Sequence, residues 1–403
     1  MSEEGKGKSE EVSSAPVVPR PVKGLGLVSL FNDFASEMVY PLLPGFLTRN
    51  LGAGALALGA LDGAADLTSA ALRWVSGRLS DRRGWQKPLI LAGYGTAVLV
   101  RPIIAVASAA WQVIGLRVLD RVGKGLRTPA RDALVAQLTP VPQRGRAYGF
   151  HRAADHLGAV AGSLAAWALL GLAVGVRDVI ALSVVPGLLA LLVLAPVLGR
   201  KDGKTEGRKE VERVERPAVS DASGRAFWGP VLALTVLTVG RLPETLLLLR
   251  LQDLDVAIVA VPLVWAGLHV VRSLGSYPGG WLSDRAGPRA TLALGGLIFA
   301  GVAGVLALPL AAGLAVIVFL ALGLATGLTE GAERATVAML APVRTGRGFG
   351  DYQAVSGFAA LPAALALGGI YQAAGGPTAL IVSSALVLVG VVLWSMAARQ
   401  LQG

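Results

Sequence analysis

The sequence predicts an all-α membrane protein with about twelve transmembrane helices in two six-helix bundles. Hydrophobic residues make up 54% of the 403 positions, charged residues make up only 16%, and the mean hydropathy is +0.61. Soluble domains usually have about a quarter charged residues. The apolar residues form long blocks, such as 180–198 and 290–313, which approach or reach the ~20 residues that a helix needs to cross a bilayer. Because lipid offers no hydrogen-bond partners, the backbone of such a block must be helical.

Turn signals between the apolar blocks divide the chain into the expected spans. These are residues 24–48, 53–79, 87–107, 109–138, 146–172, 177–199, 226–250, 256–282, 288–311, 313–340, 347–373 and 376–398. Residues 1–22 are polar and predict a disordered cytoplasmic tail. The Lys-, Arg- and Glu-rich residues 200–225 predict a linker between an N-terminal bundle, 23–199, and a C-terminal bundle, 226–399.

The positive charge is distributed unevenly along these spans. The net charge is +11, and Lys and Arg concentrate in the tail, in residues 78–87, at 144–146 and in the linker. The connections expected on the opposite side of the membrane hold little beyond Arg49, Arg177 and Arg250. This asymmetry follows the positive-inside rule, so both termini and the linker are expected in the cytoplasm. The charge therefore reflects topology, and we expect no nucleic acid partner.

Several function classes are excluded or disfavoured by what the sequence lacks. It has no cysteine, which excludes disulfides, thiolate metal sites and a cysteine nucleophile. It has no Gly-x-x-x-x-Gly-Lys-Ser/Thr phosphate loop, which argues against an ATP-driven pump. The tail has no apolar region ahead of a cleavage site, so the first span is expected to act as the membrane signal. We expect no enzymatic activity, no metal and no cofactor, with a proton as the coupling ion.

An internal repeat predicts the two bundles. The segment Gly77–Gly84, GRLSDRRG, recurs as Gly280–Gly287, GWLSDRAG, at an offset of 203 positions. The same offset places Arg131 on Arg334, Arg144 on Arg347 and Asp66 on His269. Two halves of like topology are typical of parallel-repeat transporters, which bind their solute between the halves near the bilayer midplane.

The duplicated segment resembles the signature loop between helices 2 and 3 of the major facilitator superfamily, and its second copy lies between the expected helices 8 and 9, as that family requires. The resemblance covers residues 24–398 and implies a secondary transporter. The expected role is a clasp, because an aspartate at one helix end can pair with an arginine and with the N-terminus of a neighbouring helix. We expect the first aspartate to contribute more than the second. The clasp residues are Gly77, Asp81, Arg82, Gly84, Lys87, Gly280, Asp284, Arg285 and Gly287.

The fourth and fifth spans show weaker resemblances to motifs of the same superfamily. Arg117 falls on the arginine that opens the helix-4 motif, but Arg121 stands where that motif usually has glycine. A charge at this depth must face a pathway or a partner. Gly158-x-x-x-Gly162 resembles only part of the antiporter motif, because Ser163 replaces the expected proline. Ordinary helix packing explains these two glycines equally well.

Titratable residues inside the spans give the mechanistic prediction. Asp33 and Glu37 lie one helical turn apart, so both carboxylates project from one face of the first helix. At this depth a carboxylate binds a proton more tightly or requires a cation beside it, so static ion pairs are the alternative. The expected proton- or solute-binding groups are Asp33, Glu37, Asp62, Asp66, Arg117, Arg121, Glu244 and Glu330. His151, Arg152 and Asp155 of the fifth span form either a proton relay or a gate salt bridge.

These features predict a proton-coupled exporter of a small amphipathic or charged solute in the bacterial cytoplasmic membrane. A proton-coupled importer of an organic anion is the alternative within transport, with Arg117 and Arg121 binding the anion. A membrane receptor or lipid-handling protein on the same fold, without ion-coupled transport, is the alternative from another class. The expected partners are the solute and the lipid bilayer, and the expected oligomeric state is a monomer.

Overall fold

The computed structural model describes residues 18–43, 46–52, 55–199, 225–256 and 260–398. Within these ranges the regular structure is helical, with no strand, so the all-α prediction is confirmed. Residues 1–17 of the predicted tail and residues 200–224 of the predicted linker lie outside the described residues. The first helix, α1, spans Arg20–Val39 and therefore begins inside the stretch predicted as tail.

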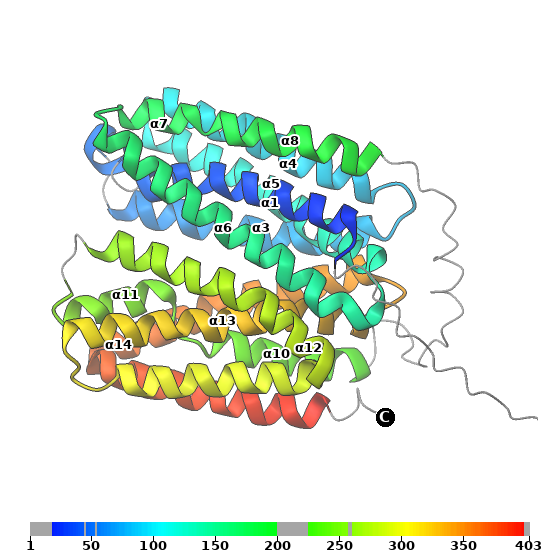
Figure 1. Ribbon diagram of the computed structural model, residues 1–403. Helices are drawn as coiled ribbons and strands as arrows, with labels where there is room; N and C mark the ends of the chain where they lie inside the picture. The colour runs from blue at the N-terminus through cyan, green and yellow to red at the C-terminus, as the bar shows by residue number, and fades with distance from the viewer. Residues whose placement is uncertain (1–17, 44–45, 53–54, 200–224, 257–259, 399–403) are drawn as a thin grey trace, which may run out of the picture.

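The N-terminal half consists of long helices joined by short turns (Figure 1). After α1 come η1 Tyr40–Leu42, η2 Phe46–Asn50, α3 Ala55–Ser80, α4 Gln86–Ile103, η3 Ile104–Val106, α5 Ala110–Leu138, η4 Val141–Gln143, α6 Arg144–Gly171, α7 Val176–Leu182 and α8 Val184–Gly199. The C-terminal half consists of α10 Arg225–Val239, α11 Glu244–Asp253, α12 Val261–Leu306, α13 Ala312–Leu340 and α14 Thr345–Ala397.

Two of these helices contain a sharp turn at a glycine. Gly287 in α12 has φ 82° and Gly375 in α14 has φ 85°, a left-handed conformation that favours glycine. Both turns fall between consecutive predicted spans. Gly84, the repeat equivalent of Gly287, has φ 85° in the turn between α3 and α4. The duplicated motif thus conserves the same backbone turn in both halves of the molecule.

The span predicted for residues 226–250 is interrupted, and its prediction as one continuous helix was wrong. Gly240 to Pro243 separate α10 from α11, because proline favours the first turn of a new helix and restricts the residue before it. Ser383 of α14 bonds the broken backbone: its hydroxyl accepts a hydrogen bond from the Leu242 N–H at 2.8 Å and donates one to the Gly240 carbonyl at 2.8 Å. Such side-chain bonds allow a helix break at membrane depth.

Six helical stretches among the described residues are long and apolar enough to cross a membrane: 86–106, 141–171, 176–199, 263–306, 312–340 and 345–397. The remaining long helices, α1, α3 and α5, hold many of the acids and arginines singled out from the sequence. Charges inside membrane helices are costly unless they face protein or water. The three more polar helices are therefore expected to line the interior of the molecule.

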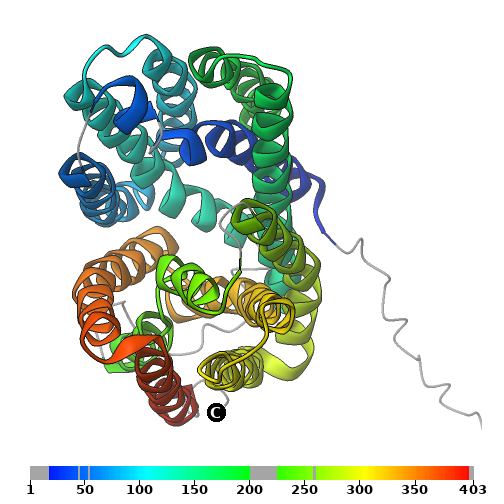
Figure 2. The same ribbon diagram turned by 90° about the vertical axis from the view of Figure 1, so that its left-hand side faces the viewer.

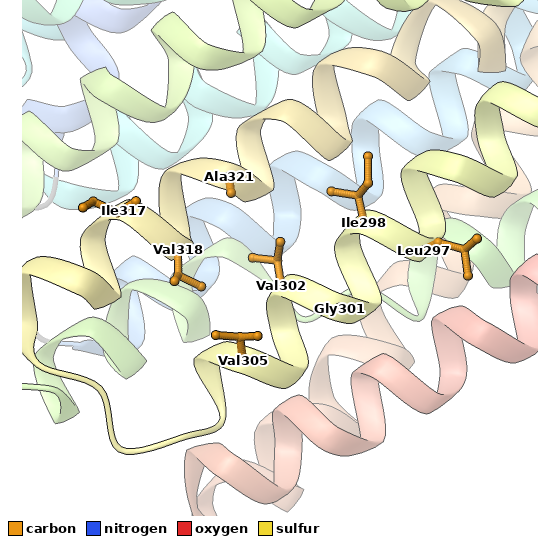
Figure 3. Close-up of a pocket in the computed structure, with 8 residues that line it drawn as sticks. All are labelled: Leu297, Ile298, Gly301, Val302, Val305, Ile317, Val318 and Ala321. Atoms are coloured by element: carbon orange, nitrogen blue, oxygen red, sulfur yellow. The ribbon is translucent and has the colours of Figure 1, made fainter.

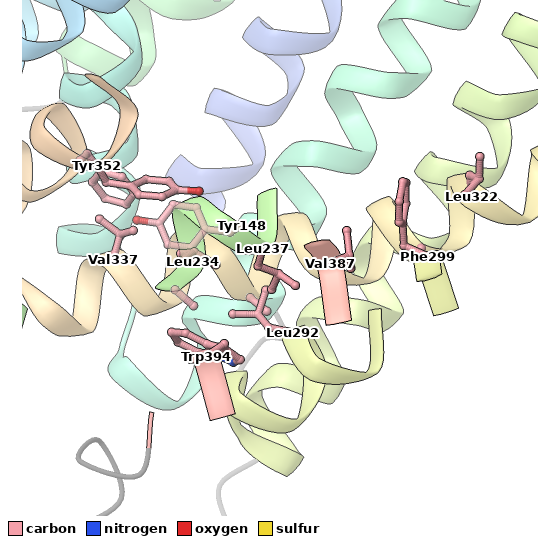
Figure 4. Close-up of a cluster of buried hydrophobic side chains, with 14 of the residues drawn as sticks. Tyr148, Leu234, Leu237, Leu292, Phe299, Leu322, Val337, Tyr352, Val387 and Trp394 are labelled. Carbon is pink, nitrogen blue, oxygen red and sulfur yellow. The ribbon is translucent and has the colours of Figure 1, made fainter. Parts of the chain in front are cut away.

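The two halves lie side by side with their helices roughly parallel (Figures 1 and 2). Helix α6 packs against α12 and α13, and α3 packs against α14, so each half contacts the other through two main seams. Buried aromatic and aliphatic side chains fill the interior of the C-terminal half, with Trp394 fully buried among them (Figure 4). The same cluster includes Tyr148 of α6, whose ring meets Phe349 of α14 edge-on at 5.9 Å, so the hydrophobic core continues across the boundary between the halves.

Candidate functional site: an interface of clasps and buried charges

Each predicted clasp aspartate binds the N-terminus of a helix in the opposite half. Asp81 accepts hydrogen bonds from the backbone N–H groups of Gly346 and Arg347 at 2.8 and 2.7 Å, where α14 begins. Asp284 accepts hydrogen bonds from the N–H groups of Gly145 and Arg146 at 2.7 and 3.0 Å, where α6 begins. A carboxylate at this position satisfies free backbone donors and interacts favourably with the helix dipole.

The glycines of the clasp permit this close approach. A Cβ on Gly280 would overlap the carbonyl oxygen of Gly145, and a Cβ on Gly77 would lie 2.6 Å from both the Gly346 oxygen and the Gly350 Cα. Both helix pairs therefore meet backbone to backbone, as small residues allow in membrane proteins. Below, the side of the molecule that contains Asp81 and Asp284 is called the clasp side.

The two arginines of the duplicated motif that were predicted to belong to the clasp, Arg82 and Arg285, are not the ones that pair with its aspartates. Arg82 is exposed, and Arg285 lies over the ring of Trp281 at 4.9 Å, so neither contacts a clasp aspartate in the described structure. Lys87 is half-buried. The arginine that does pair with Asp284 is Arg146, whose Nε donates at 2.9 Å from the other half. The sequence could not distinguish these arginines, because the partner lies 138 positions away.

A second ion pair on the clasp side was missed in the sequence. Arg78 of α3 pairs with Asp351 of α14 at 2.7 Å, and Asp351 is buried. Arg78 is a variable position of the duplicated segment, with tryptophan in the second copy, so the repeat gave no reason to select it. Arg78 has this partner because α3 of one half packs against α14 of the other half.

The structure also corrects the register of the repeat beyond the clasp loops. The sequence offset of 203 placed Arg144 on Arg347. In the structure Gly346 and Arg347 occupy the positions of Gly145 and Arg146, because each pair donates its N–H groups to a clasp aspartate. The offset in this segment is therefore 201. The connection before α14, residues 341–344, is one residue shorter than the connection before α6, residues 139–143, which accounts for one of the two positions.

A buried network of charged and imidazole groups joins the halves deeper in the molecule. Arg152 of α6 donates from Nε to Glu330 of α13 at 2.5 Å and from Nη1 to Asp155 at 2.7 Å. His156 Nε2 lies 3.0 Å from the same Glu330 oxygen, and His156 Nδ1 lies 3.2 Å from Nδ1 of His269 on α12. The three histidines of the chain all lie in this part of the molecule.

Four of the predicted site residues are thus brought together here: His151, Arg152, Asp155 and Glu330. His151 Nδ1 lies 3.7 Å from Asp155, and the Nε2 atom of this histidine is buried without a hydrogen-bond partner. The carboxylate of Glu330 pairs across the interface with Arg152. Sequence analysis left His156 and His269 out of the site, although His156 directly follows the selected Asp155 and the repeat places His269 on the selected Asp66.

Asp33 and Glu37 occupy one side of α1, both half-buried. Asp33 accepts a hydrogen bond from the Asn32 amide at 2.9 Å. The charged groups acting on Glu37 are Asp33, Lys124, Arg117 and Arg121. Arg121 has a buried Nε without a hydrogen-bond partner. The structure therefore brings the predicted acids of α1 and the predicted arginines of α5 into one electrostatic neighbourhood, and adds Lys124 to it.

Arg117 has a fixed partner that the sequence analysis did not select. Its Nη1 donates to Asp120 at 3.2 Å, and Asp120 also accepts from Nε of Arg101 at 2.9 Å. Arg101 extends to the carbonyl and side-chain oxygens of Asn32 on α1. Arg101, Arg117 and Asp120 are all at most 4% exposed. Apart from Lys87 at the start of the span, Arg101 is the only cation of an otherwise apolar segment, and this signal could have indicated a buried acid nearby.

Three predicted groups remain, and one of them, Glu244, borders the histidine network through Arg272. Asp66 of α3 is exposed, and the side chain of Asp62 lies outside what the structure describes. Glu244, at the start of α11, pairs with Arg272 of α12. Gly158 and Gly162 face the Leu30 and Phe34 carbonyl groups of α1, so these two glycines serve helix packing.

One hollow of the described structure lies outside this interface. It is a groove of about 370 Å³ between α12 and α13, lined by Leu297, Ile298, Gly301, Val302, Val305, Ile317, Val318 and Ala321 (Figure 3). Its lining is apolar, and Leu297 and Ile317 are 51% and 66% exposed on segments apolar enough to span a membrane. A lipid chain fits such a surface, and no polar group there could select a charged solute.

Comparison with known proteins identifies the family. A family model described as Major Facilitator Superfamily matches residues 25–268. The chain belongs to the major facilitator superfamily. An uncharacterized protein of Mycobacterium tuberculosis (strain H37Rv) is 30% identical over 380 residues, 91% of this chain and 90% of that protein. An uncharacterized MFS-type transporter of Methanocaldococcus jannaschii is 26% identical over 360 residues, 86% of this chain and 87% of that one.

Other similarities are shorter or structural. The multidrug resistance protein MdtH of Edwardsiella ictaluri is 35% identical over 127 residues, 32% of this chain and 31% of that protein. The human organic anion transporter MFSD10 superposes with a TM-score of 0.75 at 18% identity, over 93% of this chain and 100% of that one. The Escherichia coli fucose:proton symporter FucP gives 0.70 at 15% identity, over 94% and 98%. This major facilitator protein is therefore a multi-pass membrane transporter.

Proposed function

We propose that this major facilitator protein is a secondary active transporter of the cytoplasmic membrane that exchanges protons for a small amphipathic or charged solute. It crosses the membrane about twelve times. The turns at Gly287 and Gly375 divide the two longest apolar stretches, and the more polar α1, α3, α5 and α10/α11 supply the remaining crossings. The positive-inside rule favours placing the clasp side, with both termini, in the cytoplasm.

The observation that supports alternating access most strongly is the pair of symmetric clasps. Asp81 and Asp284 each hold the first residues of a helix that belongs to the other half, through hydrogen bonds that can break and reform. The same type of contact, a carboxylate on the first N–H groups of a helix, thus closes both seams between the halves. Two equivalent clasps flanking a buried charge network suit two halves that rock around a central site.

Proton coupling is supported by the acids and histidines inside the spans. Asp33 and Glu37 on α1, and Glu330 with His156 and His269 at the interface, are groups that can exchange a proton as their surroundings change. Several of their neighbours are arginines, which favours a charged or zwitterionic solute over a neutral one. Export is favoured by the partial likeness to MdtH, a multidrug resistance protein.

Import of an organic anion is the second candidate, and a specific observation favours it. Arg73 of α3 and Arg121 of α5 each have a buried Nε atom without a hydrogen-bond partner. A buried guanidinium with unused donors is suited to bind a carboxylate or phosphate. The likeness to MFSD10, an organic anion transporter, covers nearly the whole chain but shows the fold alone.

The two candidates differ in the sign of the gradient that drives the solute. The purified protein should be placed in proteoliposomes and offered drugs, amino acids and organic anions, with the pH gradient imposed in either direction. An exporter that exchanges protons accumulates solute on the side from which protons flow, and a symporter accumulates it on the side to which they flow. Solute binding with no gradient-driven movement in either direction would reject both, and would favour a receptor.

A further inference from the structure

The seam between α6 and α12 has a regular register from the clasp to the membrane interior. Gly145 faces Gly280, and Gly149 faces Ser276. One turn further, the Ser273 hydroxyl donates to the Ala153 carbonyl at 3.0 Å, and the next contact is His156 with His269. Each step advances along α6 and returns along α12, as expected for antiparallel helices. The histidine pair is thus the innermost contact of the series.

Its depth places this pair near the middle of the bilayer. His156 follows the first residue of α6 by twelve positions, which corresponds to about 18 Å along a helix, in a hydrocarbon core of about 30 Å. His156 is 5% exposed. His269 packs edge-on against the ring of Trp265 at 5.1 Å. Both rings are therefore held in place by their surroundings, and neither faces the lipid freely.

The distances determine where the protons of this pair must be. Glu330 is a hydrogen-bond acceptor, so Nε2 of His156 donates to it, and a neutral His156 then has a bare Nδ1. His269 must donate its own Nδ1–H across the 3.2 Å separation. A proton added at Nε2 of His269 leaves this arrangement intact. A proton added to His156 as well places two N–H groups against each other, and the contact cannot persist.

The second seam lacks such a pair. In the contact between α3 and α14, Gly77 faces Gly350, and further inward a Cβ on Gly357 would lie 3.0 Å from Ala70. The repeat places Asp66, an exposed acid of α3, on His269, and the offset of 201 places Gly357 on His156. Because Gly357 has no side chain, only the seam between α6 and α12 can bring two titratable side chains together at this position.

We propose that His156 and His269 form a proton-binding contact that closes α6 against α12 when at least one ring is neutral and releases the halves when both are protonated. This inference rests on the proposed alternating-access function and assigns one of its coupling sites. Proton binding and opening of the clasp side are then linked: lower pH favours opening, and opening favours proton uptake.

Charged side chains from each helix packed around the His156–His269 contact influence its protonation. From α6 these are Arg152 and Asp155, from α12 Arg272, and from α13 Glu330. Glu244 of α11 offsets Arg272, Arg241 lies near Glu330, and Asp33 of α1 acts through Asp155. The arginines oppose the second proton and the carboxylates favour it. Histidine is the side chain whose ordinary pKa lies nearest neutral.

The chain has no cysteine, so pairs of spin labels can be introduced without background. Val141→Cys and Ala286→Cys place labels on exposed residues of the clasp side, one beside each helix of the seam. Distances should be measured by electron paramagnetic resonance in nanodiscs from pH 8 to pH 5.5. We expect the ratio of separated to closed molecules to rise at least about tenfold as pH falls, since each linked proton contributes up to tenfold per pH unit.

His156→Gln and His269→Gln should each reduce this change to less than about twofold, because linked proton uptake is lost. Ser273→Ala is the matched control: it removes a contact of the same seam that does not titrate, so it should shift the ratio at every pH and keep the tenfold change. If a glutamine variant does not fold, His156→Phe and His269→Phe retain a packed ring.

The proposal is overturned if the label distance in the unsubstituted histidine protein does not change with pH, or if the pH response persists in the histidine variants. Gradient-driven transport is measured separately, so a pH-dependent contact without transport rejects the proposed function alone.

Discussion

Gly145 of α6 and Gly280 of α12 meet with their backbones in direct contact, leaving no room for a side chain on either. They come from different halves and lie beside the clasp formed by Asp284. The seam is therefore closed by backbone approach, and its two glycines are as necessary to the closed state as the carboxylate.

Gly280→Ala should open the clasp side. Inserting a methyl group into a closely packed contact costs about 1–3 kcal/mol, which corresponds to a roughly 5- to 150-fold shift away from the closed arrangement. The distance between spin labels at introduced Val141→Cys and Ala286→Cys, both exposed residues of the clasp side, measures this shift. Gly301→Ala is the matched control, because it is the same change in α12 beyond the turn at Gly287, where a Cβ would have no atom within 4 Å. Equal distance distributions in both variants would contradict the packing argument.

Asp284→Ala should weaken closure more than Asp81→Ala. Asp284 accepts two backbone hydrogen bonds and one from the Arg146 side chain, whereas Asp81 accepts two backbone bonds and is itself exposed. Hydrogen bonds to a charged group contribute about 1.5–3 kcal/mol each where they are shielded from water. The same distance measurement between labels at Val141→Cys and Ala286→Cys applies, with Arg82→Ala as the control in an exposed residue of the motif. This order is the reverse of the one expected from the sequence, so a larger effect at Asp81 would support the sequence argument.

Asp120→Asn should destabilise the protein as a whole. Asp120 neutralises Arg101 and Arg117 inside the N-terminal half, and removing one partner of a buried ion pair costs about 3–5 kcal/mol. Thermal unfolding in detergent should therefore occur several degrees lower. Asp66→Asn, a change of the same type at an exposed position of α3, should leave the unfolding temperature nearly unchanged. Similar unfolding temperatures for the two variants would show that the triad is not a structural unit.

Glu37→Gln should retain solute binding and lose the pH dependence of transport, whereas Asp33→Asn should impair binding itself. Glu37 lies near Asp33 and near three cations, Lys124, Arg117 and Arg121. A carboxylate left ionised at mid-bilayer without function would cost about 2.5–3.5 kcal/mol on insertion scales. Transport against pH in proteoliposomes is the measurement, with a binding assay for each variant. Wild-type accumulation and an unchanged pH profile in both would reduce these acids to ion-pair partners of the neighbouring cations.

The sequence by itself determined the class of the protein, its helices, its two repeats and the clasp loops. These depend on local properties: the length of apolar blocks, the glycine needed at a positive φ at Gly84 and Gly287, and an acid at the end of a helix. Each is set by residues within a few turns of one another. The sequence also selected Arg152, Asp155 and Glu330, because charges inside apolar spans are rare.

Only the tertiary structure decided which of these charges meet. Arg152 pairs with Glu330 across 178 positions, Arg117 pairs with Asp120 inside α5, and His156 faces His269 from the other half. Helical periodicity places a side chain on a face but does not say which face of which helix it will meet. That choice depends on how the two halves pack, and the contacts of the clasps showed that the repeat is shifted by two positions before α14. A pair of histidines separated by 113 positions becomes one proton-binding group only when the backbones of α6 and α12 come into contact.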